Sequence, residues 1–136
     1  MSEKIKKAKP RFGPMRFAEI HSYRLPLSGI VSILHRISGG LMFVLLPFVL
    51  YLLDQSLLSE DTFAYMKGVA SNWFVKLIIL ALSWAFLHHF VSGIRHLFLD
   101  MHMGMEKDTA RKISIAVFAV SLPLTLLVAL KLFGVF

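Results

Sequence analysis

Imidazole, guanidinium and hydroxyl side chains interrupt stretches of sequence that are otherwise almost wholly apolar. These polar side chains are Ser32, His35, Arg36, His88, His89, Arg95, His96 and Asp100. A neutral imidazole binds metals, a guanidinium pairs with anions, and a hydroxyl can orient a carbonyl. Because such groups are costly inside an apolar segment, we expect at least some of them to have a function.

Helical spacing places these residues on shared faces. His89 and His96 would lie about 20° apart around a helix and about 10 Å apart along it. Gly93, on nearly the same face, leaves room for a flat group or for another helix. Ser32 and Arg36 are four residues apart, one turn from each other on their own helix.

The histidine face suits a haem. Iron could be held by His89 near the centre of the bilayer, because neutral imidazole is an ordinary iron ligand. The two propionates would need cations in a low dielectric, and Arg36, Arg95 or His96 could supply them.

A quinone needs a different set of groups. Ser32 and Arg36 could bind its carbonyl, and Asp100 or His96 could form a proton route for its reduction. Asp100 could equally end its helix or pair with a neighbouring cation.

Each of these residues also has a purely structural interpretation. An intramembrane histidine often only makes a polar contact between helices, which is what we expect of His88 and is an open alternative for His89. Arg36 and Arg95 could extend to the inner headgroups. Ser32 could bond back to its own helix.

The composition indicates that lipid is the solvent for these elements. The chain has 136 residues, of which 57% are hydrophobic, whereas soluble domains are about 45–50% apolar. So small a soluble protein could not bury that fraction. The chain has no cysteine, which excludes disulfides and an iron–sulfur cluster held by this chain alone.

Three apolar stretches are each long enough to cross about 30 Å of hydrocarbon. They run from about 29 to 53, 77 to 99 and 113 to 136. The sequence therefore predicts an all-α bundle of three transmembrane helices in residues 29–136, preceded by a basic segment, 1–28.

The distribution of charge predicts the orientation. The net charge is +7, and seven of the fifteen Lys and Arg residues precede any long apolar run: Lys4, Lys6, Lys7, Lys9, Arg11, Arg16 and Arg24. The segment from Asp54 to Lys76 carries three acidic residues, whereas the one from Asp100 to Lys112 is basic near its end. Excess Lys and Arg marks the inner side, so we expect the N-terminus and the second loop to be cytoplasmic. This charge pattern does not point to a nucleic-acid partner.

Two motifs resemble those of a known family. Residues 32–39 read S-I-L-H-R-I-S-G, similar to the S-I-L-H-R-[IV]-[ST]-G motif of the cytochrome b556 subunit of succinate dehydrogenase. Residues 89–100 are similar to the family's second motif, H-x3-G-x-R-H-x3-D. Both motifs lie, in the right order, on the spans where the family carries them.

The resemblance implies roles for particular residues. His89 matches the axial ligand of haem b, whose other ligand is a histidine of a second small anchor subunit. Ser32 and Arg36 match residues of the ubiquinone site. His35, Arg36 and His96 match positions near the haem propionates.

The resemblance also implies the partners and the location. A flavoprotein subunit would oxidise succinate and an iron–sulfur subunit would pass electrons to the membrane, so this chain would not be catalytic alone. Without an Arg- and Ser-rich transit peptide, we expect a bacterial inner membrane, with the mitochondrial inner membrane as the alternative.

Two other functions compete with this one. The first is a haem-free structural anchor for a peripheral dehydrogenase. The second is a small proton conduit, which would need polar groups at every depth. Because the outer half of each span is almost purely apolar, the conduit is disfavoured.

Overall fold

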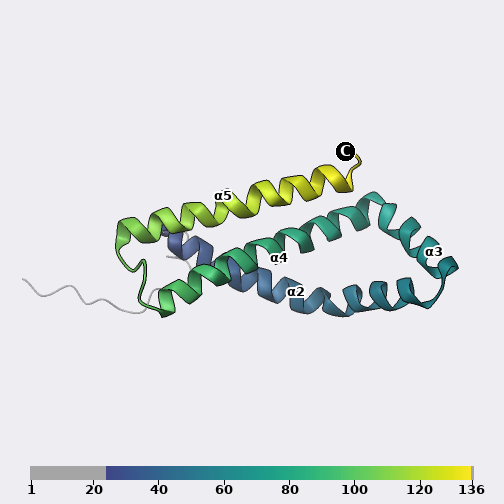
Figure 1. Ribbon diagram of the computed structural model, residues 1–136, viewed down its shortest axis with the longest axis horizontal. Coiled ribbons are helices and arrows are strands. Elements are labelled where there is room, and N and C mark those ends of the chain that lie inside the picture. Colours follow the sequence, from purple (N-terminus) through teal and green to yellow (C-terminus); the bar gives the residue numbers. More distant parts are fainter. Residues whose placement is uncertain (1–23, 136) are drawn as a thin grey trace, which may run out of the picture.

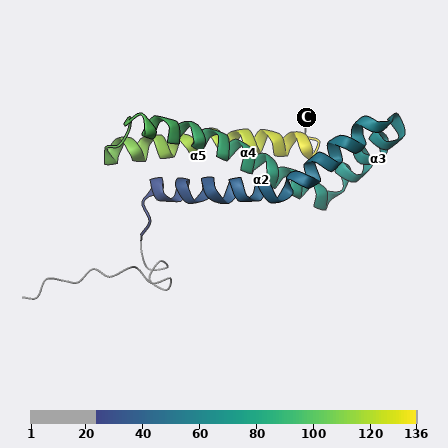
Figure 2. The ribbon, with the colours of Figure 1, turned by 90° about the horizontal axis from the view of Figure 1, so that it is seen from below.

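The computed structural model describes residues 24–135, which form four α-helices. They are α2 (Leu27–Leu58), α3 (Glu60–Ser71), α4 (Trp73–Asp100) and α5 (Lys107–Leu132). The three long helices lie side by side, and α4 packs against both α2 and α5 (Figures 1 and 2). The expected cytoplasmic segment, 1–28, lies mostly outside the described residues.

Three of the helices, α2, α4 and α5, are long and apolar enough to cross a membrane. This confirms the predicted all-α bundle of three transmembrane helices. Most helix ends lie beyond the predicted apolar cores: α2 continues to Leu58, and α5 begins at Lys107. Polar residues at these ends can be helical when a neighbouring helix packs against them. They do not raise the hydropathy of the segment, so hydropathy alone does not reveal them. The predicted end of the last span, 136, was too late, because α5 ends at Leu132.

The short helix α3 was not predicted. It begins with a capping box, in which the Ser59 hydroxyl accepts from Thr62 N and the Thr62 hydroxyl accepts from Ser59 N. It ends at Asn72, whose side chain accepts from Phe74 N and so caps the start of α4. These paired caps join α2 to α4 through a helix rather than an open loop.

At its other end, α5 stops at a glycine. Gly134 has φ of 76°, a left-handed conformation, and its N–H donates to Lys131 O while Val135 N donates to Leu130 O. Such a pair of hydrogen bonds ends a helix efficiently. The end of α5 lies beside the start of α4, because Lys76 Nζ is 5.5 Å from the centre of the Phe133 ring.

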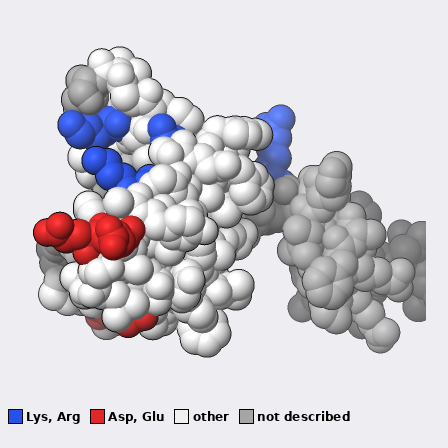
Figure 3. Space-filling model, turned by 90° about the vertical axis from the view of Figure 1, so that its right-hand side faces the viewer, with Lys and Arg blue, Asp and Glu red and all other residues white. Residues whose placement is uncertain are grey.

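The distribution of polarity is inverted compared with a soluble protein. Large apolar side chains cover the outside; Phe43, for example, is 78% exposed. The fully buried side chains are mainly polar: Ser38, His88, Ser92, Ser114 and Ser121. Figure 3 views the molecule from the end where α3 lies, and shows a largely uncharged surface on which acidic and basic side chains form a few small patches, two of them next to each other. This is the pattern expected of a bundle that faces lipid or apolar partners.

Candidate functional site

Three histidines from two helices form one cluster. The ring of His35 on α2 stacks on that of His89 on α4, with centres 3.9 Å apart and planes inclined by 14°. The ring of His96, two turns along α4, lies 4.8 Å from His35 at an angle of 53°. All three side chains are half-buried. His35 therefore bridges the two histidines that share a face of α4.

One nitrogen of His89 lies close to two polar atoms of α2. Its Nδ1 is 3.0 Å from the carbonyl oxygen of His35 and 3.2 Å from the Ser38 hydroxyl. The Ser38 hydroxyl itself donates to the same His35 carbonyl at 2.8 Å. Both partners come from α2, so the packing of α2 on α4 fixes the orientation of the His89 ring.

These distances favour a neutral His89 that carries its proton on Nδ1. A carbonyl oxygen only accepts hydrogen bonds, so the 3.0 Å contact is favourable only if Nδ1 is protonated. In neutral imidazole the lone pair then lies on Nε2. This tautomer is assigned from the hydrogen-bond network. It leaves Nε2 able to bind a metal, in the plane of the ring and away from the stacked face of His35.

Two glycines allow the histidine rings to lie this close to the helices. A Cβ atom on Gly39 would be 3.0 Å from Cε1 and 3.3 Å from Nδ1 of His89, closer than side chains normally pack. A Cβ atom on Gly93 would be 3.7 Å from Nε2 of His35, an ordinary contact. The space beside Gly93 is thus taken by a side chain of the neighbouring helix, one of the two alternatives considered from the sequence.

His88 and Arg95 are more deeply buried than the histidines of this cluster. Both lie on the buried face of α4, where His88 is 0% and Arg95 is 5% exposed. The His88 ring lies 5.4 Å from that of Trp84 and 5.6 Å from that of Phe118 on α5. His88 is therefore an interhelical packing residue, although its contacts are with aromatic rings and not the polar contact that we expected, because neither ring nitrogen has a hydrogen-bond partner.

The residues expected to bind quinone lie near the start of α2. Ser32 is half-buried, whereas Arg36, one turn further on, is exposed. Arg36 directly follows His35 on α2, and its side chain is exposed whereas that of His35 is half-buried. Asp100 is exposed and is the last residue of α4.

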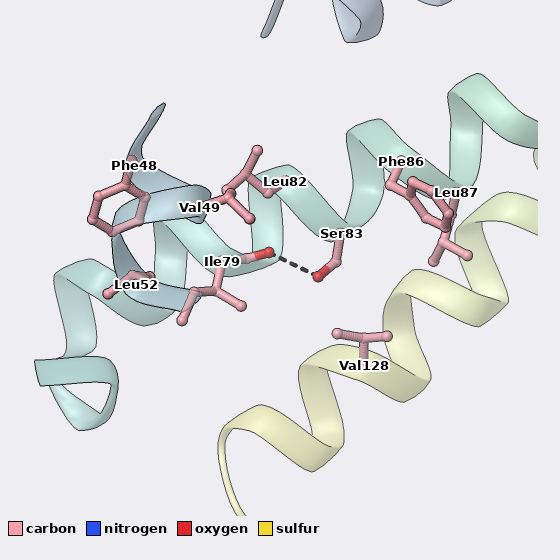
Figure 4. A pocket seen from close by; sticks show the side chains of 9 residues that line it. All are labelled: Phe48, Val49, Leu52, Ile79, Leu82, Ser83, Phe86, Leu87 and Val128. Carbon is pink, nitrogen blue, oxygen red and sulfur yellow. Dashed lines mark hydrogen bonds between the residues drawn. The ribbon is translucent and has the colours of Figure 1, made fainter. Parts of the chain in front are cut away.

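The cavity in Figure 4 has a volume of about 440 Å³ and does not include the histidines. It is formed by α2, α4 and α5 and is lined almost entirely by hydrocarbon. Its one hydroxyl, on Ser83, donates to Ile79 O within the same helix. Within residues 24–135, no group of three or more His, Asp or Glu side chains is placed to hold a bare metal ion. The histidine cluster is thus the best candidate site among the described residues.

Sequence reasoning did not assign roles to Ser38 and Gly39. Ser38 follows His35 by three residues, a spacing at which a helical serine commonly bonds back to a carbonyl. Gly39 follows His35 by four residues, so it has the same relation to a histidine as Gly93 has to His89. That parallel was available in the sequence, whereas the contact of both residues with His89 required knowledge of how α2 and α4 pack.

A bundle of this kind is a multi-pass membrane protein with a histidine site built between two of its helices. Residues 14–128 match the succinate dehydrogenase/fumarate reductase transmembrane subunit family. The chain belongs to that family, which indicates a role as a membrane anchor subunit.

Individual relatives cover most of the chain. It is 34% identical over 111 residues to the succinate dehydrogenase cytochrome b556 subunit of Paracoccus denitrificans, covering 82% of this chain and 85% of the relative. It is 32% identical to the subunit of the same name from Coxiella burnetii, over 76% of this chain and 83% of that one. The succinate dehydrogenase cytochrome b560 subunit of Porphyra purpurea is 30% identical over 66% of this chain and 74% of its own length.

Proposed function

We propose that this chain is the haem- and quinone-binding membrane anchor of a succinate dehydrogenase. The observation that carries the proposal is the pair of contacts at Nδ1 of His89, with His35 O and Ser38 Oγ. A histidine that binds a metal almost always donates its other ring N–H to an acceptor of this kind. These contacts support His89 as the axial iron ligand.

The surroundings of His89 fit haem b. Porphyrin supplies four ligands to iron, so one histidine from this chain and one from a second small anchor subunit would complete the coordination. When bound, haem b would supply a one-electron redox site; His89, which would hold it, lies about 16 Å along α4 from Asp100. Arg36 and His96 would pair with the propionates, and His35 lies between His89 and His96. Arg95, the other cation expected near the propionates, is 5% exposed.

The quinone site would lie at the same end of the bundle. Ser32 and Arg36 share one face of α2. The hydroxyl of Ser32 would bind one ubiquinone carbonyl, and the fixed charge of Arg36 would stabilise negative charge as it develops on the quinone. Asp100 and His96 would lie on the proton route. Electrons would arrive from an iron–sulfur subunit docked on this side, after a flavoprotein subunit has oxidised succinate.

The names of the relatives support this assignment. The Paracoccus and Coxiella proteins are cytochrome b556 subunits of succinate dehydrogenase. Both come from bacteria, so we place this chain in the inner membrane of a bacterium.

A reduced-minus-oxidised optical spectrum of the purified complex tests the proposal. The haem-binding anchor predicts b-type absorption bands, with about one haem for each copy of this chain. A complex that reduces quinone from succinate but shows no such bands would contradict it, and would support the haem-free anchor instead.

A further inference from the structure

The Ser38 hydroxyl contacts a side chain on another helix, His89, which no other helical hydroxyl in residues 24–135 is seen to do. Ser56, Ser83 and Ser114 also donate to carbonyls of their own helix. These bonds satisfy a hydroxyl in an apolar setting and need no further explanation. Ser38 makes the same type of bond to His35 O, but its oxygen also lies 3.2 Å from Nδ1 of His89 on α4.

Proton counting fixes the role of Ser38 in that contact. A serine hydroxyl has one proton, and Ser38 gives it to His35 O at 2.8 Å. Toward His89 the Ser38 oxygen can therefore only accept. The Nδ1 proton of His89 is shared between two acceptors, His35 O at 3.0 Å and Ser38 Oγ at 3.2 Å. Because Ser38 is completely buried, water does not compete for these bonds.

We infer that Ser38 is a positioning residue that sets both the orientation and the basicity of the His89 ligand. The inference rests on the proposed role of His89 as an iron ligand. An acceptor at Nδ1 pulls the N–H proton toward itself and makes Nε2 a stronger electron donor. A stronger donor stabilises ferric over ferrous iron, so hydrogen bonding to the axial ligand lowers the reduction potential. Two acceptors in different directions also limit rotation of the ring.

Removing the hydroxyl tests the inference. In Ser38→Ala, Nδ1 keeps one acceptor instead of two, so the midpoint potential of the haem should rise. The low-spin electron paramagnetic resonance signal of the oxidised complex should also shift as the ring turns. Ser38→Thr keeps a hydroxyl and should restore both properties toward those of the unaltered complex. Ser114→Ala is the matched control, since it also removes a fully buried hydroxyl bonded to its own helix, and it should change neither.

The outcomes separate this inference from the proposed function. If the unaltered complex holds no haem, the proposed function fails and this inference fails with it. If Ser38→Ala holds haem with the potential and resonance signal of the unaltered complex, only the inference is overturned. If Ser38→Ala does not assemble, Ser38→Cys places a much weaker acceptor at the same position. Its potential should then rise, and an unchanged potential would overturn the inference.

Discussion

A histidine side chain can turn about two bonds, and the atoms around Nδ1 of His89 remove much of that freedom. The two acceptors on α2 hold the ring by its polar edge, and the parallel His35 ring covers one face. Gly39 borders the same edge of the ring. The ring is therefore held in place before any ligand is present, which would lower the entropic cost of binding haem at Nε2, the nitrogen proposed to bind iron.

Gly39 gives a prediction at this scale. In Gly39→Ala the new Cβ atom would meet His89 Cε1 at 3.0 Å, so the ring must move by a few tenths of an ångström. We expect weaker or altered haem binding, measured as haem per complex and as the position of the haem absorption bands. Gly40→Ala is the matched control, because a Cβ atom there meets nothing within 4 Å.

The intrinsic helix stability should change in the same direction at both glycines. Alanine favours a helix interior over glycine by about 1 kcal/mol, so both changes should stabilise α2 itself. A haem defect in Gly39→Ala alone would therefore come from the contact with His89. Equal haem binding in both variants would contradict the close packing described here.

The candidate site could be predicted in part from the sequence. The spacing of His89 and His96 places them on one face of a helix, and Ser32 and Arg36 are related in the same way. The contacts of Ser38, Gly39 and Gly93 with histidines could not be predicted, because they depend on the relative rotation and height of α2 and α4. Intrahelical spacing carries no information about either quantity.

At the scale of elements, the first half of α2 directs polar side chains in two directions. His35 and Ser38 face α4, while Arg36 is exposed one residue further around the helix. The same turn thus positions a histidine on the neighbouring helix and presents a positive charge outside the bundle. A change at Arg36 can therefore be tested without disturbing the packing of α2 on α4.

Arg36→Leu and Ser32→Ala should differ in their effect on quinone reduction. A preorganised charge contributes about 2–4 kcal/mol to a transition state, equivalent to about 30- to 1,000-fold in turnover. A single neutral hydrogen bond contributes about 0.5–1.5 kcal/mol, or about 2- to 13-fold. We expect losses in those ranges when succinate–quinone reductase activity is assayed in membranes.

Two controls accompany this assay. Electron transfer from succinate to a soluble dye should survive both changes, since that path ends before the membrane. Arg36→Lys keeps the charge and should retain more activity than Arg36→Leu. Normal quinone reduction by an assembled Arg36→Leu complex would show that the proposed quinone site is wrong.

The elements themselves were largely predictable. Each membrane helix has an apolar core long enough to be recognised from composition alone. Helix α3 was missed because its stability comes from the caps at Ser59 and Asn72 and from packing on its neighbours, not from an apolar run. The end of α2 and the start of α5 extend past their apolar cores, because a helix can continue beyond the lipid boundary with polar residues. Hydropathy therefore marks only the part of each helix that lies in lipid.

At the scale of the whole molecule, an apolar exterior encloses buried polar groups. Ser92, Arg95, Ser114 and Ser121 lie inside the described bundle together with His88. Small polar residues let helices approach closely where no hydrophobic effect drives them together. The exterior carries large apolar side chains, which suits contact with lipid and with a second anchor subunit.

The orientation of the bundle is testable as a whole. The basic N-terminal segment and the loop before α5 should be cytoplasmic, and α3 should lie on the opposite side. A reporter active only in the cytoplasm should be silent when fused after Thr62 and active when fused after Met105. The reverse pattern would invert the bundle and move the expected docking side of the iron–sulfur subunit.

Of two neighbouring histidines on α4, the proposed function assigns haem iron to His89 and not to His88. The two residues are adjacent in sequence but lie on different faces of α4. His89 has Nδ1 close to His35 O on α2, whereas His88 is fully buried and contacts Phe118 on α5. The most direct test is the reduced-minus-oxidised spectrum of complexes carrying His89→Leu or His88→Leu. His89→Leu should lose the haem or change its bands, and His88→Leu should leave the ligation intact. A complex whose bands survive His89→Leu but are altered by His88→Leu would contradict the account.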